Sequence, residues 1–157
     1  MILTVFTLVH VAISLVGIVA GMVVLRGLLN AKRLDRWTVV FLASTVLTSV
    51  TGFLFPFHGF LPSHGVAIVS LVILPVAVFA RYRRGLIGRW RPAYVITAMT
   101  ALYLNVFVLG AQTFQKVPPL KALAPTQSEP PFAIAQLVVL AAFVAFTILA
   151  VVRFRPG

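Results

Sequence analysis

The chain has 157 residues, of which 61% are hydrophobic and only 10% are charged. Soluble domains carry about 25% charged residues, so this composition, with a mean hydropathy of +1.10, excludes an ordinary water-soluble domain. The net charge of +11 comes from basic residues between and after the apolar runs, which indicates membrane topology rather than nucleic-acid binding. The absence of cysteine excludes disulfides, thiolate metal sites and iron–sulfur clusters.

Five apolar runs are long enough, or nearly so, to cross a hydrocarbon core of about 30 Å at about 1.5 Å per residue. We therefore predict an all-α integral membrane protein, a single domain built as a bundle of five transmembrane helices. The predicted spans are Ile2–Leu25, Trp37–Phe55, His64–Ala80, Ala93–Phe114 and Phe132–Val152. The first run lacks a basic leader and a cleavage site, so we do not interpret it as a signal peptide. The third contains Pro75, which is expected to bend it.

The basic residues predict the orientation of the bundle. Eleven of the thirteen lie in the first linker, the third linker and the tail, whereas only Lys116 and Lys121 lie in the fourth linker. With five spans, this asymmetry predicts an amino terminus outside and a carboxyl terminus in the cytoplasm, in a bacterial-type inner membrane or a plasma membrane. An aromatic belt is expected at the cytoplasmic boundary; its members are Trp37, Tyr82, Trp90 and Tyr94.

The fourth linker, residues 115–131, reads "QKVPPLKALAPTQSEPP". Its prolines predict an extended connector without regular helix. No internal repeat is visible, which argues against a transporter built from inverted repeats.

The predicted spans contain no Asp, Glu, Lys or Arg, and the two acids, Asp35 and Glu129, lie in linkers. Ion-coupled pumps usually place an ionisable group at membrane depth, so a stand-alone pump is disfavoured. No zinc-protease motif, phosphate loop or paired-carboxylate site is present either. The sequence therefore favours a protein that is not an enzyme.

Polar residues form stripes along several spans. In the first span they fall on one helix face; they are Thr7, His10, Ser14, Gly17 and Gly21. The second span carries hydroxyl residues from Ser44 to Thr51, the fourth carries Thr97, Asn105 and Gln112, and the fifth carries Gln136. One interpretation is helix packing through small residues and interhelical hydrogen bonds. The other is a polar pocket in the outer half of the bundle.

All three histidines, His10, His58 and His64, are predicted in the outer half. Imidazole is a common metal ligand and an axial ligand of haem, and His10 with His64 is the one plausible pair for haem b. Two observations disfavour haem: His64 begins its helix near the interface while His10 lies deeper, and few basic residues are available for the propionates. A copper or zinc ion held by His10, His58 and His64 is a further alternative. The stretch "FPFHGFLPSH" that contains His58 and His64 is also well explained as a turn.

Two functional hypotheses follow. The first is a non-catalytic accessory or scaffold subunit of a membrane complex, surrounded by lipid and contacting a membrane-protein partner or a second copy, with Gly17 and Gly21 as the first contact to test. The second is a redox or ligand-binding protein that holds haem, a quinone or a metal in the outer half. Its ligand-contacting residues would be His10, His64, Ser14, Asn105 and Gln112. Neither hypothesis involves nucleic acid.

Overall fold

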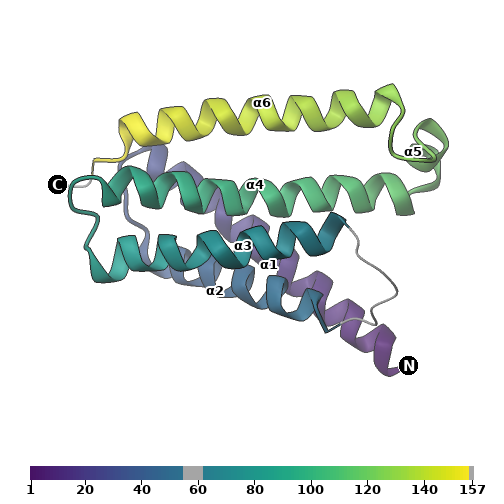
Figure 1. Ribbon diagram of the computed structural model, residues 1–157, viewed down its shortest axis with the longest axis horizontal. Coiled ribbons are helices and arrows are strands. Elements are labelled where there is room, and N and C mark those ends of the chain that lie inside the picture. The colour runs from purple at the N-terminus through teal and green to yellow at the C-terminus, as the bar shows by residue number, and fades with distance from the viewer. Residues whose placement is uncertain (55–61, 156–157) are drawn as a thin grey trace.

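The computed structural model describes residues 1–54 and 62–155, and within them the chain is helical with no strand. The elements are α1 (Ile2–Leu29), α2 (Asp35–Gly52), α3 (Pro62–Val78), the π-helical turn η1 (Phe79–Arg83), α4 (Trp90–Lys116), α5 (Pro118–Leu123) and α6 (Pro130–Arg153). The long helices lie side by side, with α4 between α3 and α6, and α1 crosses the others obliquely (Figure 1). The all-helical prediction is confirmed.

Four helices in the described part of the chain are long and apolar enough to cross a membrane. They are Ile2–Leu29, His64–Arg83, Trp90–Lys116 and Pro130–Arg153. The chain is thus a membrane protein by length and composition of its helices. The second predicted span is also a helix, α2, but its 18 residues begin with Asp35 and Arg36 and include six hydroxyl side chains, so it is less apolar than the other four. Of all helix pairs, α1 and α2 pack most extensively.

The helices extend beyond the apolar runs that predict them. Helix α1 continues through Arg26, whose charge lies in the last turn, where a cation interacts favourably with the helix dipole. Helix α3 contains Pro75 and is continued by η1 to Arg83. The connection to α4 then turns sharply at Gly85 and Gly88, which have φ of +60° and +59°, a conformation that glycine adopts without strain.

The prediction of an extended fourth linker is wrong. Helix α4 runs to Lys116, and Pro118–Leu123 form the short helix α5. Pro118 and Pro119 occupy the first turn of α5, where the backbone N–H that proline lacks has no partner within a helix. The prolines therefore begin this helix rather than prevent it. Farther along, Thr126 donates hydrogen bonds to the Glu129 carboxylate, and these lower the pKa of Glu129.

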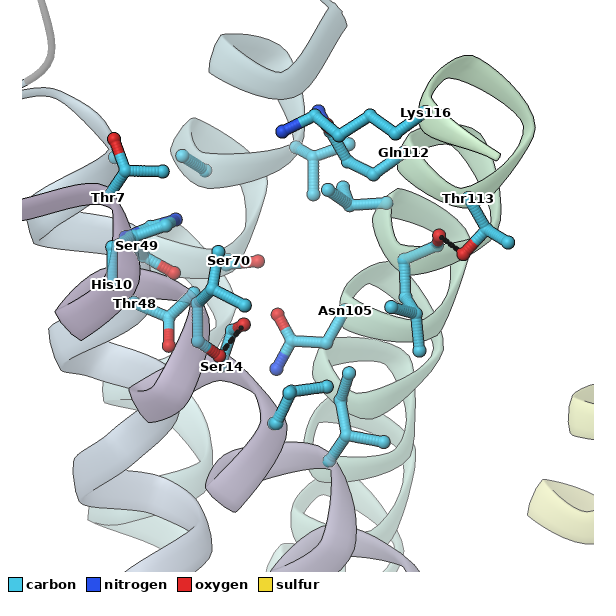
Figure 2. Close-up of a pocket in the computed structure, with 18 of the residues that line it drawn as sticks. Thr7, His10, Ser14, Thr48, Ser49, Ser70, Asn105, Gln112, Thr113 and Lys116 are labelled. Atoms are coloured by element: carbon cyan, nitrogen blue, oxygen red, sulfur yellow. Dashed lines mark hydrogen bonds between the residues drawn. The ribbon is translucent and has the colours of Figure 1, made fainter. Parts of the chain in front are cut away.

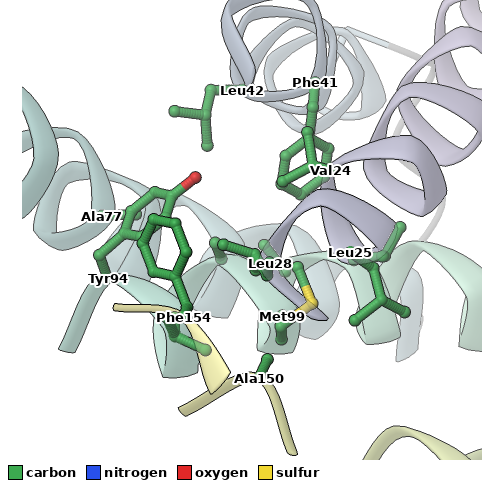
Figure 3. Packing of buried hydrophobic residues seen from close by; sticks show 14 of the residues in the cluster. Val24, Leu25, Leu28, Phe41, Leu42, Ala77, Tyr94, Met99, Ala150 and Phe154 are labelled. Atoms are coloured by element: carbon green, nitrogen blue, oxygen red, sulfur yellow. The ribbon is translucent and has the colours of Figure 1, made fainter. Parts of the chain in front are cut away.

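The buried apolar residues gather toward one end of the bundle, which we call the basic end because the arginine-rich connections lie there. Figure 3 shows Val24 and Leu28 of α1, Phe41 of α2, Met99 of α4 and Ala150 of α6 meeting in this core. Tyr94 packs beside Phe154 and is completely buried. The prediction that Tyr94 belongs to an interfacial belt is therefore wrong, whereas Trp37 and Tyr82 are 45% and 54% exposed.

Gly17 and Gly21 serve packing within one chain. A Cβ atom on Gly17 would lie 3.0 Å from Ser44 Oγ, and one on Gly21 would lie 2.5 Å from Leu102 Cδ1 and 3.0 Å from the Phe41 ring. The missing side chains let α1 approach α2 and α4 closely. The two glycines are buried, so they are not on a surface that a second copy could reach.

Arg81, counted above as a linker charge, is in fact buried at the basic end. Its side chain is 0% exposed, and Nη2 donates to Asp35 Oδ1 at 2.5 Å and to the Arg33 carbonyl at 3.0 Å. The guanidinium also lies 5.3 Å from the centre of the Tyr94 ring, within the range of a cation–π contact. Arg81 thus joins the end of η1 to the start of α2 and to the α1–α2 connection.

A second arginine joins α4 to α6 at the same end. Arg91 Nη1 donates to the carbonyl oxygens of Val151 at 2.6 Å and Phe154 at 2.8 Å. These carbonyls lie at the carboxyl end of α6, where backbone acceptors lack helical partners and a cation is favourable. Arg81 and Arg91 therefore both connect helix ends at the basic end by hydrogen bonds.

The two acids of the chain provide a matched test of the Arg81 contact. We expect Asp35→Asn to lower the free energy of unfolding by about 2 kcal/mol, because it leaves a buried guanidinium without a counter-charge. Glu129→Gln removes an exposed charge and keeps an oxygen that can accept from Thr126, so it should change stability much less than Asp35→Asn does. Thermal unfolding of the two variants in the same detergent checks this. Equal midpoints for both variants would contradict the structural role of Arg81.

Candidate functional site

A cavity of about 580 Å³ lies between α1, α2, α3 and α4 at the end of the bundle away from the core (Figure 2). We call this the open end. The cavity volume is within the range of about 300–1,000 Å³ that is typical of small-molecule sites. Its polar lining comes from four helices; the residues are Thr7, His10, Ser14, Thr48, Ser49, His64, Ser70, Asn105, Gln112, Thr113 and Lys116. Valine, leucine and isoleucine side chains complete the wall.

The five residues predicted to contact a ligand all line this one cavity. His10 and Ser14 come from α1, His64 from α3, and Asn105 and Gln112 from α4. The polar faces of these helices therefore meet at one cavity. His58, the remaining residue of the predicted metal set, lies outside the described residues.

Not every polar residue of the stripes belongs to the cavity lining; those outside it are Ser44, Thr45, Thr51, Thr97 and Gln136. Thr97 donates to the Ala93 carbonyl of its own helix at 2.7 Å. Gln136 of α6 donates to the Phe107 carbonyl of α4 at 3.2 Å, and its amide lies against Gly110. Gln136 thus fastens α6 to the far side of α4 and has a packing role.

His10 is held by the last turn of α2. Its Nδ1 lies 2.7 Å from Thr51 Oγ1, and that hydroxyl also lies 2.7 Å from the Leu47 carbonyl oxygen. A carbonyl only accepts, so the single hydroxyl proton goes to Leu47, and His10 Nδ1–H donates to Thr51. In the neutral ring this tautomer places the lone pair on Nε2, the form that accepts a hydrogen bond or binds a metal.

The expectation that His64 lies much shallower than His10 is wrong. The His64 ring stacks on Phe53, with ring centres 6.0 Å apart, and is 8% exposed. Phe53 follows Thr51, the partner of His10, by two residues, so the end of α2 contacts both histidines. The reason is that α1 begins beyond the ends of α2 and α3 (Figure 1), so depth counted from its first residue is overestimated.

The structure brings together two of the three histidines of the predicted metal site. Within residues 1–54 and 62–155, no three His, Cys, Asp or Glu side chains gather into a group able to hold a metal ion. His10 and His64 line the same cavity, and His58, the third member of the predicted metal set, lies outside the described residues.

Most hydroxyl groups around the cavity bond to their own helix. Ser14 donates to the Val11 carbonyl at 2.7 Å, Thr48 to Ser44 at 2.8 Å, and Thr113 to Leu109 at 2.7 Å. Such bonds satisfy the hydroxyl proton locally. These residues therefore offer a ligand mainly an acceptor oxygen.

Ser70 is different, and the sequence analysis did not single it out. Its side chain is 0% exposed, and among the described residues Ser70 Oγ has no hydrogen-bond partner. Burying a hydroxyl without a partner costs about 1–3 kcal/mol. The signal in the sequence was its isolation, because Ser70 is the one hydroxyl residue in the apolar run from residue 65 to residue 80. Across the cavity, Asn105 Nδ2 makes only a long contact of 3.4 Å with Thr45.

Comparison of the chain with models of protein families, with curated proteins and with solved structures finds no match. The site is therefore argued from its own residues.

The hydroxyl of Ser70, which has no hydrogen-bond partner among the described residues, allows a test of whether this residue lowers the stability of the ligand-free protein. We expect Ser70→Ala to raise the free energy of unfolding of the ligand-free protein by about 1 kcal/mol, because it removes a buried polar group without opening a large cavity. Thermal unfolding in detergent measures this, with Ser14→Ala as the control, since that hydroxyl is already bonded. A clear loss of stability in Ser70→Ala would show that Ser70 has a structural role instead.

Proposed function

We propose that this chain is a membrane protein that binds a lipophilic small molecule with polar groups in the cavity at the open end. The observation that carries the proposal is the convergence of polar side chains from four helices on one open cavity of about 580 Å³. Polar groups within a membrane bundle need partners, and packing alone would pair them with one another. Ser70, which has no such partner among the described residues, supports a site that completes its hydrogen bonds with a ligand.

The lining suits hydrogen-bonded binding better than catalysis. The lining contains hydroxyls, amides, two imidazoles and the Lys116 ammonium but no carboxylate. It therefore lacks the pair of carboxyl groups that many hydrolases use as acid and base. Val11 and Leu15 from α1 and Val108 and Leu109 from α4 supply apolar contact. The ligand classes that fit are a quinone or another amphiphile. Haem b is the redox variant of the same proposal, and His10 and His64 are the residues that would hold it.

An accessory role is the second candidate, and the surface of α6 favours it. Only 11% of the most apolar stretch of α6 is buried inside the protein, compared with 28% to 33% in the other three candidate spans. A partner helix on this face would bury it, by packing and not by hydrophobic transfer. This role predicts that the cavity holds no specific molecule.

We further propose that α2 also crosses the membrane, with the amino terminus outside and the basic end in the cytoplasm. The gathering of arginines at one end of the bundle supports this orientation. The chain has no cysteine, so single cysteines in place of Arg33, Arg84 and Lys121 are clean reporters. We expect an impermeant maleimide to label position 121 on intact cells and positions 33 and 84 only after lysis. Labels at 33 and 84 on opposite sides would show that α2 does not cross.

Filling the cavity tests the binding function directly. We expect Ala67→Phe, which places a ring in the cavity from α3, to reduce a co-purifying lipophilic molecule at least tenfold relative to wild type. The matched control is Ile68→Phe, at the next position and 46% exposed on the outer surface, which should retain it. Organic extraction of both proteins, purified in the same detergent, followed by mass spectrometry, measures the difference.

The same samples separate the alternatives. A Soret band that disappears in His10→Ala would establish haem, and an ultraviolet difference spectrum between oxidised and reduced protein would reveal a quinone. If wild type, Ala67→Phe and Ile68→Phe carry the same extractable molecules, the binding proposal is refuted and the accessory role remains.

A further inference from the structure

Among the described residues, the mouth of the cavity carries a positive charge and no negative one. Lys116, the last residue of α4, lines the cavity together with Gln112, one turn earlier. In Figure 2 both side chains extend from α4 over the cavity. Among the described residues Lys116 has no ion-pair partner: the ion pairs found there join Arg33 and Arg81 to Asp35, while Glu129 is bound by Thr126.

The inner end of the cavity offers contacts of a different kind. The buried Ser70 Oγ and the Asn105 amide lie in the lining there, without any charge beside them. Asn105 precedes Lys116 by eleven residues on α4, which corresponds to about 16 Å along the helix axis. Between these two levels the wall includes Val108 and Leu109. The cavity is therefore cationic at its mouth and neutral but polar at its inner end, and between these ends it has an apolar wall on α4 together with hydroxyl and imidazole groups from the other helices.

We propose that the ligand is an anionic amphiphile with a carboxylate or phosphate at one end and a hydrogen-bonding oxygen farther along its apolar chain. The anionic group pairs with Lys116, the chain lies against the valine and leucine wall, and the inner oxygen bonds with Ser70 and Asn105. This inference rests on the proposed function and adds the charge and the length of the ligand.

The charge of the ligand follows from the position of Lys116. Lys116 is exposed at the mouth, where its charge is available to an incoming anion, and no carboxylate in the lining competes for it. The inner oxygen follows from Ser70, because a plain hydrocarbon end would leave that hydroxyl buried and unbonded. A fatty acid without a second polar group therefore satisfies one end of the cavity only.

Three probes of one chain length separate these two contacts. They are 12-hydroxystearate, which has both polar groups, stearate, which lacks the inner hydroxyl, and 1,12-octadecanediol, which lacks the charge. We expect the wild-type protein in lipid nanodiscs to bind 12-hydroxystearate about tenfold more tightly than either of the others, since each lost contact is worth about a factor of ten. Binding is measured by titration against the mole fraction of probe in the lipid.

Two variants assign the contacts to residues. Lys116→Gln should weaken the two carboxylates about tenfold and leave the diol unchanged, whereas Ser70→Ala should weaken the two hydroxylated probes and leave stearate unchanged. The matched control is Lys121→Gln, which removes the neighbouring lysine on α5, outside the cavity lining, and should change none of the three.

The outcomes distinguish this inference from the function on which it rests. If the diol binds as tightly as 12-hydroxystearate, if Lys121→Gln causes the same loss as Lys116→Gln, or if none of the probes binds, the inference is overturned. A neutral molecule that is lost on Ala67→Phe would then leave the binding function intact. If the extracted molecules are also identical in wild type and Ala67→Phe, both proposals fail.

Discussion

The bundle depends on one buried charge. Arg81 is enclosed at the basic end, and its guanidinium is held by the Asp35 carboxylate and the Arg33 carbonyl. A buried guanidinium is tolerated only with such partners, so the end of η1, the start of α2 and the α1–α2 connection must lie together. The Arg91 contacts to the end of α6 extend the same constraint to α4 and α6. The positions of the helix ends are thus set by hydrogen bonds rather than by apolar contact, which has little directional preference.

Because α1 crosses the other helices at an angle, the bundle is tightly packed at the basic end and open at the opposite end (Figure 1). Gly17 and Gly21 let α1 approach α2 and α4 at its middle. On the same face, the preceding Thr7, His10 and Ser14 carry larger, polar side chains. Because α1 is fixed near its carboxyl end and crosses the others at an angle (Figure 1), its amino-terminal half diverges from α4. The space that opens is the cavity, and the same stripe that packs at Gly21 lines that cavity at His10 and Ser14.

Helical periodicity explains what the sequence could predict. Residues spaced by three, four or seven share a face whatever the tertiary structure. The alignment of His10 with Ser14 and of Asn105 with Gln112 could therefore be predicted from the sequence, and so could the helices.

The sequence could not predict the direction in which each helix face points. Gln136 packs on Gly110 and Tyr94 enters the core, because those choices depend on which helix becomes the neighbour. Arg81 was misjudged for a related reason, since a basic residue next to an apolar run has the same sequence signature whether it meets solvent or a buried carboxylate. Ser70 was overlooked because a single hydroxyl forms no stripe.

The separation of the two ends has a functional consequence. The basic half holds the apolar core and the hydrogen bonds of Arg81 and Arg91, although Arg81 Nε and Nη1 and the Tyr94 hydroxyl find no hydrogen-bond partner among the described residues. The cavity residues contribute fewer contacts between helices. Ser14, Thr48 and Thr113 bond within their own helices, so these bonds form whether or not α1 and α4 come together. A cavity whose walls are individually satisfied does not collapse to pair its polar groups, and it keeps its shape for a ligand. Ser70, as a buried group outside this local pairing, is then the position where binding and folding are in direct opposition, which is typical of residues that serve a site rather than a core.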